Sequence, residues 1–145
     1  MVVGRRFEFL EHTADVYIAA YGRNLKEAFE NAALAMFETM TDTADVKRER
    51  EDTIEVEGED MESLLYNWLE SLLVKFEIEN ILYSDFNVLS IKGENGKLRL
   101  KAKIYGEPFD SERHKQKVGI KAVTYHRMEI NERPDGVTIK FILDI

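Results

Sequence analysis

The segment from Lys97 to Ile104 constrains the fold most, because basic and apolar side chains alternate through it without a break. Apolar residues occupy the even positions from 98 to 104, and lysine or arginine the odd positions from 97 to 103. This alternation is typical of a strand with one face in a core and one in water. The preceding Asn95-Gly96 pair favours a tight turn, since both residues tolerate positive φ. We therefore expect residues 81–91 and 97–104 to form an antiparallel hairpin.

Two other segments carry apolar residues at helical spacing. The first starts after Asn24, which with Glu27 three residues later has the form of a capping box, and it continues to Met40. The second starts at Asp60, a residue type preferred at helix N-termini, and ends near Asn80. Each segment has a single apolar stripe, so each predicted helix must bury one face.

The remaining strands are expected at 15–21, 53–57, 120–130 and 137–144. The last two are joined by Arg133-Pro134-Asp135-Gly136, in which proline and glycine suit a turn. The order β-α-β-α-β-β-β-β predicts an α+β fold, with two helices packed on a mainly antiparallel sheet. At 145 residues, the chain has the usual size of one domain, which we expect to span residues 1–145.

Composition narrows the classes of function. The absence of cysteine excludes disulfides, thiolate metal sites and cysteine nucleophiles. No apolar run approaches the ~20 residues of a membrane span, and a net charge of −8 disfavours direct binding to nucleic acid. A charged fraction of 33% with a single glutamine is common in heat-adapted proteins. We expect a soluble, cytoplasmic protein of thermophilic origin.

Asp15 and Asp144 stand at the ends of the first and last expected strands. If these strands are neighbours, the two carboxylates and the main-chain oxygens of Ile145 would converge. Such hard oxygen ligands are those that Ca²⁺ or Mg²⁺ prefers. On the residues alone, however, two solvated strand-end aspartates are the simpler interpretation.

A second candidate is an acid/base set of His114 and His126 with Glu107 and Asp110, because a carboxylate fixes the tautomer of a neighbouring histidine. It would suit a stand-alone metal-dependent phosphoesterase or ribonuclease. Against it, alternation places His126 on the core face of the strand at 120–130, where a hydrogen-bonded buried histidine is the commoner outcome. The nucleophile-elbow and phosphate-loop signatures of known enzymes are missing.

A third candidate is the local basic patch of Arg113, Lys115, Lys117 and Lys121 on an otherwise acidic chain. A patch of this size would steer one partner, such as the acidic surface of another protein. A solvated loop is an equally good interpretation.

Several strings together resemble the archease family, and the resemblance covers the full chain. They are Glu11-His12-Thr13-Ala14-Asp15-Val16, Tyr105-Gly106-Glu107, Asp110, Arg113-His114, Lys121-Ala122-Val123-Thr124-Tyr125-His126 and Leu143-Asp144-Ile145.

The resemblance implies a non-enzymatic accessory protein for the GTP-dependent, RtcB-type tRNA-splicing ligase. Members of the family promote guanylylation of the ligase histidine and multiple turnover, and are described as chaperone-like modulators of other proteins, including an RNA methyltransferase. The resemblance also implies a divalent metal ion, commonly Ca²⁺, bound by Asp15, Asp144 and a main-chain oxygen of Ile145. The charged and histidine positions of the matching strings are then possible partner-binding residues: His12, Asp110, Arg113, His114, Lys121 and His126.

Overall fold

The structure is a computed structural model that describes residues 5–11 and 14–145. Two helices and eight strands follow one another in these residues. They are β1 (Phe7–Leu10), β2 (Val16–Gly22), α1 (Leu25–Met40), β3 (Arg50–Gly58), α2 (Met61–Glu79), β4 (Ile81–Glu94), β5 (Lys97–Pro108), β6 (Ala122–Val123), β7 (Glu129–Arg133) and β8 (Gly136–Asp144). A short 3-10 turn, Thr43–Asp45, lies between α1 and β3.

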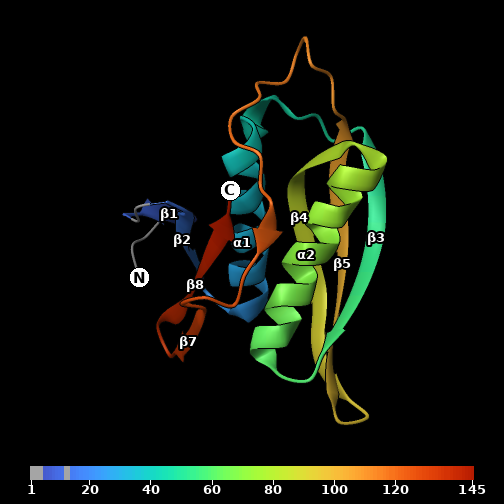
Figure 1. Ribbon diagram of the computed structural model, residues 1–145. Coiled ribbons are helices and arrows are strands. Elements are labelled where there is room, and N and C mark those ends of the chain that lie inside the picture. The colour runs from blue at the N-terminus through green and yellow to red at the C-terminus, as the bar shows by residue number, and fades with distance from the viewer. Residues whose placement is uncertain (1–4, 12–13) are drawn as a thin grey trace.

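The strands form two antiparallel sheets. The first has the order β1-β2-β8-β6, with β7 also paired to β8, and the second has the order β3-β5-β4. Helix α1 contacts β2 and β8 of the first sheet and β4 of the second, while α2 packs mainly on the second sheet (Figure 1). The predicted α+β class, with two helices on antiparallel strands, is confirmed, although the strands divide between two sheets instead of forming one.

Local hydrogen bonds explain where the helices begin and end. The Asn24 side chain accepts a hydrogen bond from the Glu27 amide at 2.9 Å, but the Glu27 carboxylate accepts from the amide of Arg23, one residue before the cap. Asp60 and Ser63 form the full reciprocal capping box at the start of α2. Helix α2 ends at Asn80, whose left-handed φ of 59° stops the helix.

One apolar core joins the helices to both sheets. Trp68 of α2 is fully buried, and its Nε1 donates a hydrogen bond to the carbonyl oxygen of Phe29 in α1 at 3.0 Å. This bond lets a large aromatic side chain fill the space between the helices without leaving its polar atom unsatisfied. Among the described residues, neither helix has the length and apolar character needed to cross a membrane.

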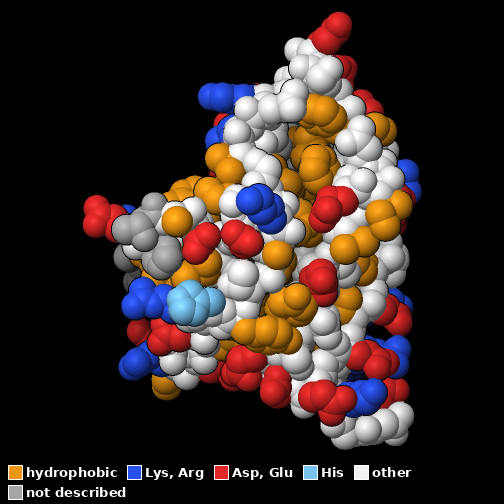
Figure 2. All heavy atoms as spheres, viewed as in Figure 1, with side chains coloured by type: hydrophobic (Ala, Val, Ile, Leu, Met, Phe, Trp, Pro, Cys, Tyr) orange, Lys and Arg blue, Asp and Glu red, His pale blue; other side chains and the backbone are white. Residues whose placement is uncertain are grey.

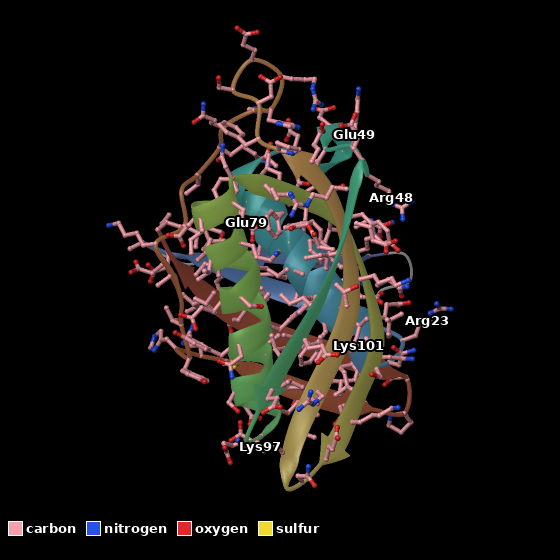
Figure 3. The ribbon with its side chains drawn as sticks, turned by 90° about the vertical axis from the view of Figure 1, so that its right-hand side faces the viewer. Arg23, Arg48, Glu49, Glu79, Lys97 and Lys101 are labelled. Atoms are coloured by element: carbon pink, nitrogen blue, oxygen red, sulfur yellow. The ribbon has the colours of Figure 1, made fainter. Side chains whose placement is uncertain are left out.

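The hairpin of β4 and β5 has the predicted turn and the predicted alternation. Asn95 and Gly96 both have positive φ, at 53° and 78°. Leu100, Ala102 and Ile104 are fully buried, as predicted for the apolar face. The opposite face of β5 carries the basic side chains, among them Lys97 and Lys101 (Figure 3). Three of these basic residues pair with glutamates of β3: Arg99 with Glu55 and Glu57, Lys101 with Glu55, and Lys103 with Glu51.

The predicted strand at 120–130 is wrong for its central residues. Only Ala122–Val123 and the residues from Glu129 onward are extended. Thr124 Oγ1 donates a hydrogen bond to the carbonyl oxygen of Ile142 at 2.8 Å, and Arg127 has a φ of 55°, which no extended strand allows. His126 is therefore exposed in a turn, not buried in the core. The short strand β1 was not among the predicted strands.

Candidate functional site

The pairing of β2 with β8 brings the two candidate metal-binding aspartates to the same end of the first sheet, where β2 begins and β8 ends. We call this end the Asp144 edge. Val16 and Leu143 are partners in this antiparallel ladder. Asp15 immediately precedes Val16, in a bend just outside this ladder, and Asp144 immediately follows Leu143, so the two aspartates flank a paired position. Residues directly opposite each other in such a ladder have Cα atoms about 5 Å apart. The first and last predicted strands are thus neighbours, as a shared ion would require.

The surroundings of Asp144 leave its carboxylate available. Its main-chain oxygen accepts a hydrogen bond from the Lys121 amide at 2.7 Å, as β6 joins the edge. The Asp144 side chain makes no hydrogen bond or ion pair with any described residue. Asp15, Asp144 and Ile145 are all partly buried. For Asp144, the combination of partial burial and unengaged carboxylate oxygens suits a metal ligand that is reached from solvent.

The donor set at this edge fits a hard cation. Within residues 5–11 and 14–145, no three histidine, cysteine or acidic side chains gather in a way that could hold a metal ion. The candidate side-chain donors at this edge are the carboxylates of Asp15 and Asp144, and further ligands would have to be main-chain oxygens or water. An all-oxygen set of this kind suits Ca²⁺ or Mg²⁺ better than a transition metal. His12, the other titratable residue of this end of the chain, lies outside the described residues.

Glu107 and His114 form a buried pair at the end of β5. Nε2 of His114 lies 3.0 Å from Oε2 of Glu107, and Nδ1 accepts a hydrogen bond from the Asp110 amide at 2.9 Å. Glu107 also accepts from the Lys47 amide at 2.6 Å and from the guanidinium of Arg113. Burial favours a higher pKa for Glu107, but the bonds from Arg113, Lys47 and His114 outweigh it and lower the pKa to about 2.

This geometry assigns the pair a structural role. His114 is 2% exposed, and both its ring nitrogens are engaged. Because Nδ1 accepts an amide N–H, the proton of the neutral ring lies on Nε2 and is donated to Glu107. An acid/base catalyst has to reach a substrate, whereas this ring is enclosed. The predicted set is also divided, since His126 is exposed in the turn between β6 and β7.

The basic patch is smaller in the structure than in the sequence. Arg113 donates to Glu107 and, at 2.9 Å, to the carbonyl oxygen of Asp45. Lys117 pairs with Glu38 at 2.9 Å and with Asp42 at 3.2 Å. In the part of the chain that the structure describes, the exposed side chains of Lys115 and Lys121 have no acidic partner. Of these two, Lys121 lies at the Asp144 edge.

One surface feature was missed by reasoning from the sequence. The rings of Tyr66 on α2 and Tyr125 in the turn after β6 stack with centroids 4.4 Å apart. The two residues are far apart in the chain, and no local pattern signals the contact. Figure 2 shows apolar side chains over the face that carries α2, with acidic side chains among them.

Comparisons with known proteins agree on one family. The model of the archease protein family matches residues 7–145. A protein archease from Sulfurisphaera tokodaii is 48% identical over 141 residues, covering 97% of this chain and 99% of the relative. One from Pyrococcus abyssi is 49% identical over 132 residues, covering 91% and 92%.

Solved structures give the same result for the fold. The solution structure of Methanobacterium thermoautotrophicum protein 1598 is 44% identical, with a TM-score of 0.85 and coverage of 97% of this chain and 99% of that one. A crystal structure from Thermotoga maritima, described as an archease and possible chaperone, has a TM-score of 0.59 over 95% of this chain and 96% of that one. At 20% identity, this second similarity concerns the fold alone.

Proposed function

This chain belongs to the archease family, and from that premise we propose that it activates a GTP-dependent tRNA-splicing ligase. It would promote transfer of GMP to the active-site histidine of the ligase and support multiple turnover, without joining RNA itself. The observation that carries the proposal is the family match over residues 7–145, which includes both Asp15 and Asp144.

The proposed site of action is the Asp144 edge, where β2 begins and β8 ends. Asp15 and Asp144 would hold a divalent ion, Ca²⁺ by preference, together with a main-chain oxygen of Ile145. A bound divalent ion offsets negative charge, such as that of a triphosphate or of facing carboxylates. Asp15 and Asp144 would present their two carboxylates at the Asp144 edge, from which they would approach the metal-dependent site of the ligase. The register of Val16 with Leu143 supports this placement.

The proposed partner is a protein and not a free nucleic acid. The net charge of −8 repels phosphate backbones, so the affinity of this chain for RNA alone should be weak. Lys121, which is exposed and adjacent to Asp144, and Lys115 in the preceding loop supply local positive charge for docking on an acidic protein surface. Another candidate contact is His126, which is exposed.

Two alternative functions belong to other classes of protein. A chaperone-like modulator of RNA-modifying enzymes, such as a methyltransferase, would use the same docking surface. A stand-alone phosphoesterase or ribonuclease would need His114 at a substrate, and the enclosure of His114 beside Glu107 disfavours it.

Guanylylation of the purified ligase by labelled GTP, with and without this protein, separates these functions. The proposal predicts a faster rate of ligase labelling and more ligated RNA per ligase when the protein is present. An unchanged rate would contradict it. RNA cleavage by the protein alone, abolished by His114→Ala, would support the enzyme instead. Stimulation of a methyltransferase without stimulation of the ligase would support the chaperone-like function.

Calorimetric titration of the protein alone with Ca²⁺ separates two ways in which the aspartates would act. If they hold an ion within this protein, Asp144→Asn should abolish Ca²⁺ binding. If they instead complete the metal shell of the ligase, Ca²⁺ binding should require both proteins.

A further inference from the structure

The stacked pair of Tyr66 and Tyr125 presents an aromatic face to solvent. The planes of the two rings are 6° from parallel, and their centroids are 4.4 Å apart. Tyr66 is partly buried on α2, so it covers one side of Tyr125, which remains 53% exposed. Because the second ring supports the exposed ring from behind, one flat aromatic face remains available to a partner.

The turn that carries Tyr125 is held firmly in place. Thr124 Oγ1 donates to the Ile142 carbonyl oxygen at 2.8 Å and accepts from the His126 amide at 3.3 Å. The Met128 amide donates to the carbonyl oxygen of Tyr125 at 3.1 Å. Arg127 adopts a positive φ of 55°, a conformation that is uncommon for residues other than glycine. The backbone therefore fixes Tyr125 before any partner arrives, which lowers the entropic cost of binding.

The charge around the tyrosine pair is negative. Glu62 and Glu70 lie one helical turn before and after Tyr66, on the same face of α2. Both are exposed, and neither forms a hydrogen bond or ion pair with the described residues. Burial raises the pKa of Tyr125, and so do the nearby Tyr66, Asp60 and Glu70. By contrast, other exposed glutamates on this protein, such as Glu55 and Glu79, are engaged by arginine or lysine.

We propose that Tyr125, Tyr66, Glu62 and Glu70 form a binding site for an arginine side chain of a partner protein. The planar guanidinium would lie over the exposed face of Tyr125 and donate N–H groups to the carboxylate of Glu70 or of Glu62, which flank Tyr66 on either side. Aromatic faces attract cations, and arginine stacks on them more readily than lysine does. The flanking carboxylates repel phosphate, so the complementary surface is a basic protein segment and not a nucleic acid.

The proposal does not depend on the ligase or on a bound metal. It is tested by titrating the protein alone with acetyl-Gly-Arg-Gly-amide and following backbone and tyrosine side-chain NMR shifts. A peptide with citrulline in place of arginine has nearly the same shape without the charge. Shifts centred on residues 62–70 and 124–127, much smaller for the citrulline peptide, are expected. Equal shifts for both peptides, or shifts centred elsewhere, would overturn the proposal.

Variants locate the interaction. Tyr125→Ala and the double variant Glu62→Gln/Glu70→Gln should each weaken binding about threefold to fivefold, as expected for exposed cation–π and ion-pair contacts. Tyr125→Phe keeps the ring and should bind within about twofold of wild type. The control Glu77→Gln/Glu132→Gln removes the same charge from exposed positions elsewhere and should leave binding unchanged.

Two results of the variant series would refute the site. One is a loss of affinity in the control equal to that in Glu62→Gln/Glu70→Gln, since only net charge would then matter. The other is concentration-dependent self-association in sedimentation that Tyr125→Ala abolishes, since the occupant would then be a second copy of this chain. The thermal unfolding midpoint of each variant verifies that the fold is retained.

Discussion

Nε2 of His114 donates a hydrogen bond to Oε2 of Glu107 across 3.0 Å, and the two residues are 2% and 3% exposed. Phe109 stacks on the histidine ring, with centroids 6.0 Å apart. The pair holds the loop after β5 against the rest of the fold, because Glu107 also accepts from the Lys47 amide. His114 and Glu107, which the sequence suggests as an acid/base pair, thus stabilise the conformation of the loop after β5.

Replacing Glu107 with glutamine should destabilise the protein at neutral pH. The change leaves Arg113 and the Lys47 amide without their charged acceptor, and loss of one member of a buried charged network costs about 3 kcal/mol. Urea unfolding at neutral pH measures the difference. Asp110→Asn is the control, because among the described residues the exposed Asp110 carboxylate accepts a hydrogen bond only from the Glu112 amide.

The same variant should also change the pH dependence of stability. The pKa of Glu107 is about 2 in the folded protein, below the value of about 4.3 for an unperturbed glutamate. A lowered folded-state pKa contributes stability above the unfolded value, and this stability is lost as pH falls toward the folded value. Unfolding free energies of wild type and Glu107→Gln should therefore converge between about pH 5 and about pH 2. A difference that stays constant over this range would refute the assigned pKa.

Two buried threonines near the end of α1 should respond in opposite directions to the same substitution. Among the described residues, the Thr41 hydroxyl is buried without a hydrogen-bond partner, whereas that of Thr39 donates to the Ala35 carbonyl oxygen at 3.0 Å. Thr41→Val removes an unsatisfied polar group and should raise the unfolding midpoint by about 2 to 4 °C. Thr39→Val should lower it. Calorimetric melting distinguishes the two, and a decrease for Thr41→Val would show that its hydroxyl is satisfied.

Gly106 should tolerate no side chain. A Cβ atom at this position would overlap the carbonyl oxygen of Leu82 on the neighbouring strand β4 and approach Tyr83 Cα to 2.8 Å. Gly106→Ala must push two backbones apart, so we expect at least about 3 kcal/mol of destabilisation or failure to fold. A Cβ at Gly93 meets nothing within 4 Å, so Gly93→Ala should change stability by less than about 1 kcal/mol. Equal stability of the two variants would contradict the strand packing described for β4 and β5.

The helices could be predicted because their determinants are local. Asn24 and Asp60 cap α1 and α2 through hydrogen bonds to amides three residues later, and Asn80 ends α2. The turn at Asn95-Gly96 has a similarly local cause. Each signal lies within a few residues of the feature that it determines.

The errors arise where distant contacts override local pattern. Residues 124–128 have strand-like composition, but the hydrogen bond from Thr124 to Ile142 turns the chain out of the sheet. The burial of His114 depends on Lys47 and Arg113 converging on Glu107, and the stacking of Tyr66 on Tyr125 depends on how β6 meets α2. Asp15 and Asp144 were identified as strand-end residues, yet only the pairing of β2 with β8 brings those ends together.

The rate of ligase guanylylation in the presence of Asp15→Ala or Asp144→Ala tests the central claim most directly. Each variant removes one of the two carboxylates at the edge of β2 and β8, and each should lower the rate to that of the ligase alone. Glu77→Ala, which removes an exposed carboxylate from α2, should keep the full stimulation given by wild type. Full stimulation by both aspartate variants would contradict the proposed role of this edge.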